Sequence, residues 1–101
     1  MISHTLKGEV LSIMNQTNTD SKRKYIHPKI ISKSWVINIT NTGMVHSRSF
    51  VASVILAENN NQFYQLLTFC QDLADDCFNT KIRLQAIGDT ISINRQKNRL
   101  Q

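Results

Sequence analysis

The sequence predicts a mainly β protein: a small barrel of five strands with one α-helix between the third and fourth strands. Residues 81–96 alternate apolar and polar side chains on both sides of Gly88 and Asp89, which predicts a terminal β-hairpin. Residues 60–78 carry apolar side chains at helical spacing, and three strand-like runs precede them. This order of strands, helix and hairpin defines the predicted architecture.

The length of 101 residues suits one domain with one modest core. We expect this domain to span residues 1–94, followed by a basic tail at residues 95–101. No run approaches the roughly 18 apolar residues that a membrane span needs, so no membrane partner is expected. The opening MISHTLKGEVLSI lacks the basic and apolar regions of a secretory signal. The expected location is therefore cytoplasmic.

The predicted first strand lies within residues 1–15, where Val10 and Ile13 favour a strand. Residues 15–34 are polar and rich in turn formers in their first half, which predicts a long loop. Isoleucines in the second half of this segment indicate that it packs down as an edge segment or strand extension.

The next two strands are predicted at residues 34–42 and 45–57, which are rich in β-branched and aromatic side chains. Asn41, Thr42 and Gly43 between them have the chemistry of a tight turn, so the two strands form a hairpin. The second run is long for a single strand, which predicts a bulge or a bend within it.

Residues 60–78 permit two interpretations. The apolar spacing favours one helix over the whole segment, with a helix N-cap in the asparagine run that precedes it. Alternatively, residues 63–69 form a strand and only residues 71–78 are helical. On the longer helix, Cys70 and Cys77 would share one face, too far apart for a disulfide, as reduced and buried small side chains.

The chain is basic, with 12 Lys and Arg against 7 Asp and Glu and a net charge of +5. An excess of positive charge favours a polyanionic partner such as nucleic acid. The plainer alternative is that the charge keeps a small protein soluble.

The candidate nucleic-acid-binding residues combine cations with aromatic rings. Single-stranded nucleic acid requires both, because cations neutralise phosphates and ring faces stack on bases. Tyr25 lies in the polar, basic loop and is the ring expected to be exposed, whereas Trp35 and Phe50 are also compatible with the core. The complete set is Lys22, Arg23, Lys24, Tyr25, Lys33, Trp35, Arg48, Phe50, Lys81 and Arg83.

Other site classes lack a signature. The three histidines are scattered, and neither cysteine has a partner at metal-ligand spacing, so no metal site is expected. The sequence has no GxSxG motif and no glycine-rich loop that would hold a phosphate. Asp72, Asp75 and Asp76 are better explained by a solvated helix face than by a cation site. We therefore expect no catalytic residues and no cofactor.

The segment FYQLLTFCQDLADDCFNTKIRLQAIGD resembles the OB-fold single-stranded DNA-binding proteins, and the small chain is similar to their primosomal PriB type. The resemblance lies in Phe69, in Leu73-Ala74 and in the run 82–88, which ends on glycine. It implies an OB barrel in which the binding strands and the first long loop carry the candidate residues given above.

We therefore expect a non-catalytic protein that binds single-stranded DNA or RNA, with DNA favoured over RNA, as in DNA replication. The alternative is a protein-interaction subunit or adaptor in a larger assembly, whose exposed strand edges pair with a partner. A second copy of the chain, forming a homodimer, is a further expected partner.

Overall fold

The computed structural model describes residues 2–3, 5–16 and 18–93. The chain is mainly β, as predicted, but it begins with a helix and continues with six strands. These elements are α1 (Leu6–Gln16), β1 (Arg23–Ile30), β2 (Val36–Ile39), β3 (Val45–Glu58), β4 (Asn61–Ala74), β5 (Cys77–Phe78) and β6 (Arg83–Ser92). Residues 94–101, which include the predicted basic tail, lie outside the described residues.

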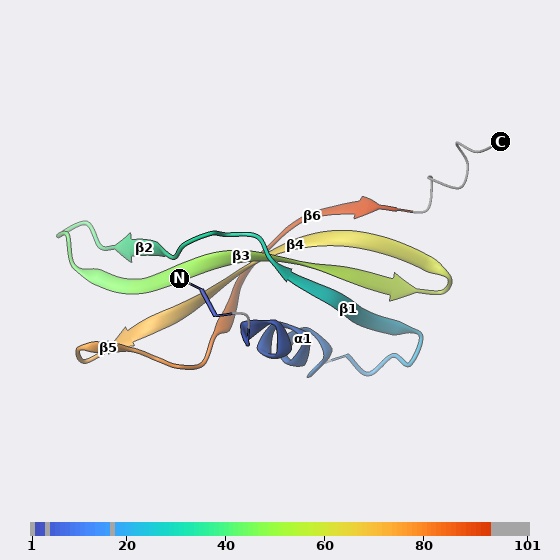
Figure 1. Ribbon diagram of the computed structural model, residues 1–101, viewed down its shortest axis with the longest axis horizontal. Helices are drawn as coiled ribbons and strands as arrows, with labels where there is room; N and C mark the ends of the chain where they lie inside the picture. The colour runs from blue at the N-terminus through green and yellow to red at the C-terminus, as the bar shows by residue number, and fades with distance from the viewer. Residues whose placement is uncertain (1, 4, 17, 94–101) are drawn as a thin grey trace.

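Strands β3 and β4 form a long central ribbon, paired without interruption from Ser47 opposite Asp72 to Glu58 opposite Asn61. β1 and β2 both pair with the outer edge of β3, while β5 and β6 pair with β4. All of these pairings are antiparallel. The sheet twists and curls into a half-barrel (Figure 1). It contains six strands, so the predicted number of five strands is wrong.

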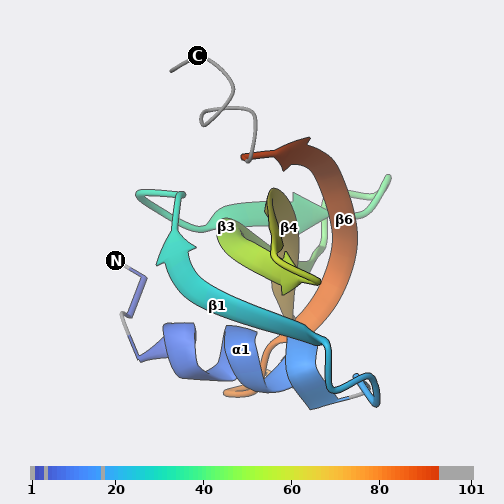
Figure 2. The ribbon, with the colours of Figure 1, turned by 90° about the vertical axis from the view of Figure 1, so that its right-hand side faces the viewer.

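The core lies between α1 and one face of the sheet. Figure 2 shows α1 beneath the curled sheet, next to β1. Leu6, Val10 and Met14 are spaced four residues apart, so they form one buried stripe along the helix. This stripe packs with Ile2 against Phe50, Ala52, Val54, Leu67, Phe69 and Ile82.

The prediction of a strand within residues 1–15 is wrong. Val10 and Ile13 favour strands as residue types, but tertiary packing overrides such weak preferences. The four-residue spacing of the buried side chains is helical, and burial against the sheet stabilises this short helix.

The predicted helix at residues 60–78, between the third and fourth strands, is also wrong, because β4 occupies most of this segment. The alternative interpretation is confirmed for residues 63–69, which are strand, but residues 71–78 are not helical. Gln65 and Gln71 are buried on the same face as Leu67 and Phe69. Two polar residues in buried positions hide the period of two, which is why the helical spacing looks stronger.

The predicted long loop contains β1, so the expectation that its second half forms an edge segment is confirmed. The register of β1 shifts between Ile26 and Lys29, where His27 has a φ of 54° and Pro28 follows. A proline has no N–H to donate to a neighbouring strand, so it is tolerated at a bulge on a sheet edge.

The predicted hairpin and its turn are confirmed by β2 and β3. Gly43 has a φ of 85°, and its N–H donates to the Thr40 carbonyl at 2.9 Å. The bulge expected within residues 45–57 is present. Asn38 pairs with Ser47 and Ile39 pairs with Val45, so His46 is an extra residue on β3.

No turn forms at Gly88, because β6 runs through it from Arg83 to Ser92. A Cβ at position 88 would lie 3.3 Å from the Leu66 carbonyl oxygen, so the glycine allows close strand contact. The remainder of the predicted terminal hairpin, residues 94–96, lies outside the described residues.

Candidate functional site

The aromatic residues of the predicted binding face belong to the core or pack against it. Phe50 is 1% exposed and stacks on Phe69, with ring centroids 5.8 Å apart. Trp35 is half-buried and meets Phe50 edge-on at 5.2 Å, so the core interpretation holds for Phe50 and largely for Trp35. The expected exposure of Tyr25 is wrong: the residue is half-buried, packs against the core, and its backbone N–H donates to Asn15 Oδ1 at 3.0 Å. All seven aromatic residues of the chain are buried or half-buried, so none is fully exposed to solvent.

Two of the predicted arginines are paired with carboxylates. Arg83 donates from Nε and Nη2 to the two oxygens of Asp72, at 2.6 and 2.9 Å. The hydrogen bond from Arg83 lowers the pKa of Asp72, and the same bond raises the pKa of Arg83. Arg23 Nε lies 3.6 Å from Glu58 Oε2. Both arginines are therefore less available to an external anion.

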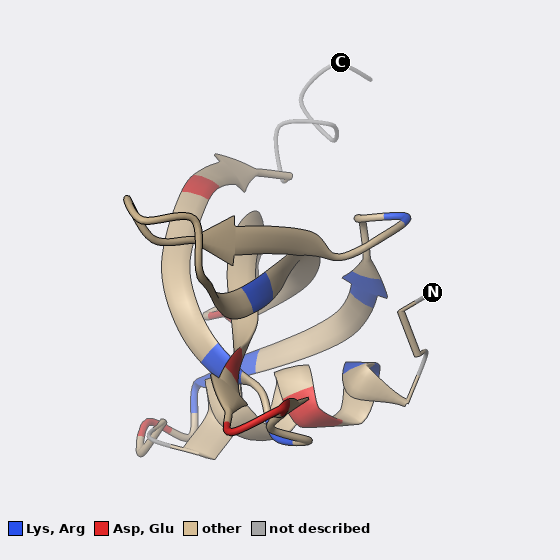
Figure 3. Ribbon diagram, turned by 90° about the vertical axis from the view of Figure 1, so that its left-hand side faces the viewer, with Lys and Arg blue, Asp and Glu red and all other residues tan. Residues whose placement is uncertain are grey.

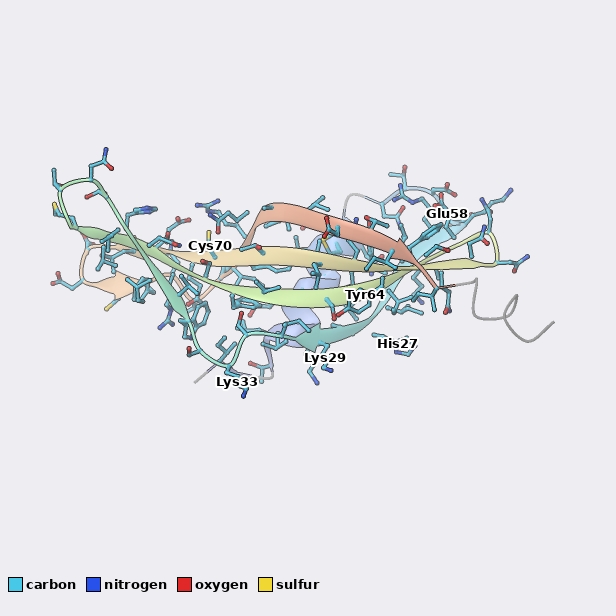
Figure 4. All side chains as sticks on the ribbon, turned by 90° about the horizontal axis from the view of Figure 1, so that it is seen from above. His27, Lys29, Lys33, Glu58, Tyr64 and Cys70 are labelled. Atoms are coloured by element: carbon cyan, nitrogen blue, oxygen red, sulfur yellow. The ribbon has the colours of Figure 1, made fainter. Side chains whose placement is uncertain are left out.

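The predicted lysines are exposed and dispersed. Figure 3 shows the positions of Lys and Arg spread over several elements of the sheet and over α1. Within the part of the chain that the structure describes, Lys22, Lys24, Lys33 and Lys81 form no ion pair. Lys33 and Lys29 lie along the same side of the molecule, by β1 and the segment that leads to β2 (Figure 4).

The structure brings Trp35 and Arg48 together and adds two partners that the sequence analysis missed. The Arg48 Cζ lies 4.1 Å from the Trp35 ring centroid and 4.4 Å from that of Phe78. Arg48 Nε donates to Gln71 Oε1 at 2.9 Å. Phe78 and Gln71 were assigned to a helix, and no local pattern links either residue to β3. We call Trp35, Arg48, Gln71 and Phe78 the Arg48 cluster.

A pocket of about 280 Å³ adjoins the Arg48 cluster. Glu9 of α1 and Thr80, which follows β5, line the pocket together with the cluster. Gln71 also donates from Nε2 to the Thr80 carbonyl at 3.1 Å, which ties the pocket wall to β4.

The most unusual surface of the protein is its exposed apolar hairpin. In the described residues, eight large apolar side chains are exposed, and five of them belong to the β2–β3 hairpin. These five are between 39% and 67% exposed, and we call them the apolar hairpin: Val36, Ile37, Ile39, Met44 and Val45. Soluble proteins rarely leave such groups together in water without a binding role. The sequence alone does not reveal that these five side chains are exposed, because apolar residues of these types also suit the interior of a barrel.

The two cysteines differ in environment. Cys70 is buried in β4, as expected, and burial raises the pKa of its thiol. Cys77 in β5 is exposed, so its expected burial is wrong. Both are free thiols.

Comparison with protein-family models, with curated proteins and with solved structures gives no match. The resemblance to OB-fold proteins therefore stays a prediction. Among the described residues, no three His, Cys, Asp or Glu side chains are grouped so that they could hold a metal ion. The described helix is too short and too polar to cross a membrane.

Proposed function

We propose that this protein is a protein-interaction module that binds an extended segment of a partner along strand β2. The observation that carries the proposal is the apolar hairpin, whose five large side chains are exposed at one end of the sheet. Exposed apolar side chains gathered on one element are typical of protein-binding surfaces. This corresponds to the alternative function that the sequence left open.

The position of β2 supports binding by strand addition. β2 pairs with β3 on one side only, and its other edge has no strand partner among the described residues. Val36 lies opposite Ser49 and Ile37 opposite Arg48, so these neighbours project to opposite faces of the sheet. Both side chains are exposed, so β2 is apolar on both faces and open at one edge. A partner strand could add backbone hydrogen bonds at the edge and cover the apolar side chains.

The charge of the molecule favours an acidic partner segment over a second copy of the chain. The net charge of +5 would make two copies repel one another. Lys29 and Lys33 lie by the edge formed by β1 and β2, and neither forms an ion pair within the described residues. An acidic, partly apolar strand would therefore match both the charge and the apolar character of this edge.

The first test is site-specific crosslinking in the cells that make the protein. A photoreactive benzoylphenylalanine replaces Ile39, which is 60% exposed, and in the control it replaces Ile87, which is 57% exposed. We expect a discrete adduct from position 39 that is absent from position 87, because only position 39 lies in the apolar hairpin. Equal labelling at both positions would contradict the proposal, and an adduct of two copies would make a second copy the occupant.

The second test measures affinity with the partner found by crosslinking, purified and free of other proteins. Ile39→Ser should weaken binding at least tenfold, because burying an isoleucine contributes about 1.5–3 kcal/mol. Ile87→Ser is the matched control and should leave the affinity unchanged. An equal loss in both variants, or none in either, would move the interface away from the apolar hairpin.

A second candidate is single-stranded nucleic acid, and the unpaired lysines favour it. Lys22, Lys24, Lys29 and Lys33 could contact phosphates, although no aromatic residue beside them is fully exposed for stacking. Binding of this kind would be electrostatic and largely independent of base sequence, because every nucleotide carries a phosphate.

Titration of a labelled oligothymidine at low and at physiological salt tests this candidate. If it is correct, affinity falls linearly in log salt, and replacing Lys24 and Lys29 by Gln reduces the slope by about 0.7 for each lost contact. Lys81→Gln, remote from β1 in the chain, is the control. Absence of binding at low salt would remove the candidate.

A further inference from the structure

The Arg48 cluster fixes a guanidinium group beside a pocket. The rings of Trp35 and Phe78 both contact the group, at 4.1 and 4.4 Å from Cζ to the ring centroids. Gln71 accepts the Nε–H at 2.9 Å, and Gln71 is itself 5% exposed. Two cation–π contacts and one hydrogen bond to a buried amide restrict how the guanidinium can turn.

The fixed guanidinium keeps most of its donors unused. Nε is the only donor of Arg48 that is hydrogen-bonded within the part of the chain that the structure describes. The two Nη groups therefore offer a pair of parallel N–H donors. Glu9 lines the same pocket but forms no ion pair with Arg48. An arginine held in place with its terminal donors free is suited to bidentate binding of a planar anion.

The pocket favours a carboxylate over a phosphate. Its volume of about 280 Å³ has room for a short acidic side chain. Glu9 adds one negative charge to the lining, so a singly charged ligand is repelled less than a doubly charged phosphate.

We propose that the Arg48 pocket binds the carboxylate of an Asp or Glu side chain in the partner segment. This inference rests on the proposed function, because it assigns one recognition element of the partner. Arg48 lies opposite Ile37 in the β2–β3 register, so Arg48 of the pocket and Ile37 of the apolar hairpin project from the same face of the sheet. A strand docked along β2 would place side chains on the face that carries both residues. The apolar hairpin then contributes buried area, and Arg48 selects the acidic residue.

The test uses the full-length protein and two small probes that differ only in charge. The probes are N-acetyl-aspartate amide and its uncharged isostere N-acetyl-asparagine amide, titrated while NMR follows the Trp35 indole N–H and the Arg48 Nε–H. Trp35 is the only tryptophan, so its indole signal is unambiguous. We expect saturable shifts of both signals with the aspartate probe and at least tenfold weaker binding of the asparagine probe. Equal binding of the two probes, or no shift with either, would overturn the proposal.

Variants assign the binding to Arg48. Arg48→Lys keeps the charge but loses the pair of donors that can bind both carboxylate oxygens. We expect the affinity for the aspartate probe to fall at least tenfold. Arg83→Lys is the control, because that arginine already binds Asp72 and should not contribute. Undiminished binding in Arg48→Lys would refute the assignment. The comparison of the two probes on the unaltered protein does not depend on how any variant folds.

Two further outcomes separate this inference from the proposed function. N-acetylalanine carries its carboxylate at the position of a peptide C-terminus instead of on a side chain. If the protein binds N-acetylalanine more than tenfold more tightly than the aspartate probe, the assignment to a side-chain carboxylate is overturned. If the crosslinked partner needs Ile39 but binds Arg48→Lys with full affinity, the carboxylate site is wrong while the interaction module stands. If the aspartate probe binds but no adduct forms at position 39, the carboxylate site stands without the proposed function.

Discussion

Residue types in this chain indicate chemistry, but burial decides whether that chemistry is available. Trp35, Arg48 and Phe50 are the residue types that bind nucleic acid, and the sequence places Arg48 and Phe50 on one face of a strand. The structure brings these three residues together, yet Phe50 is buried against α1 and Trp35 packs edge-on against Phe50. The sequence allows a core position for Phe50 and Trp35, but it does not show what covers them, because the segment that forms α1 favours a strand by residue type.

The burial of Phe50 gives a direct prediction for stability. Phe50→Ala should lower the free energy of unfolding by about 3–5 kcal/mol, because it removes a buried ring that packs between α1 and β4. Chemical denaturation followed by circular dichroism measures this change. Val36→Ala, on the exposed face of β2, is the control and should change stability by no more than about 0.5 kcal/mol. A loss below about 1 kcal/mol for Phe50→Ala would place this ring outside the core.

At the scale of elements, the turn at residues 41–43 was predictable, but the turn expected at Gly88 and Asp89 was wrong because β6 runs through both residues. Long-range burial was not predictable. The turn at Asn41–Gly43 depends on neighbouring residues only, so the β2–β3 hairpin follows from the sequence. β4 was misassigned because Gln65 and Gln71 occupy buried positions, where their amides bond to Thr90 Oγ1 and to the Thr80 carbonyl. Thr90 lies 25 residues from Gln65 and Thr80 lies nine residues from Gln71, so both partners are outside β4 itself.

An added Cβ at Gly8 or at Gly43 would have no other atom within 4 Å, yet we expect substitution by alanine to have opposite effects at the two positions. Gly43 has a φ of 85°, so Gly43→Ala should destabilise the protein by about 1–2 kcal/mol through backbone strain alone. Gly8 lies within α1, and Gly8→Ala should stabilise the protein by roughly 0.5–1 kcal/mol. Thermal or chemical unfolding of the two variants provides the comparison. Changes of the same sign would contradict either the turn or the helix.

At the scale of the whole molecule, the sheet is open where the sequence predicted a closed barrel. The period-two patterns identify strands and so predict a mainly β chain, but they do not specify which strands become neighbours. Pairing of β1 with the edge of β3 that β2 also uses depends on contacts between residues far apart in the chain. The resulting half-barrel has exposed edges and dispersed cations (Figure 3), which favours strand addition over a continuous polyanion groove.

Hydrogen exchange of the free protein and of its complex with the crosslinked partner tests the central claim most directly. If a partner strand docks on β2, the amide protons of residues 36–45 become protected in the complex, because their hairpin gains backbone bonds and is covered. Residues 83–92, which form the opposite edge of the sheet, should exchange at the same rate in both states. Protection at residues 83–92 with none at residues 36–45 would contradict the account.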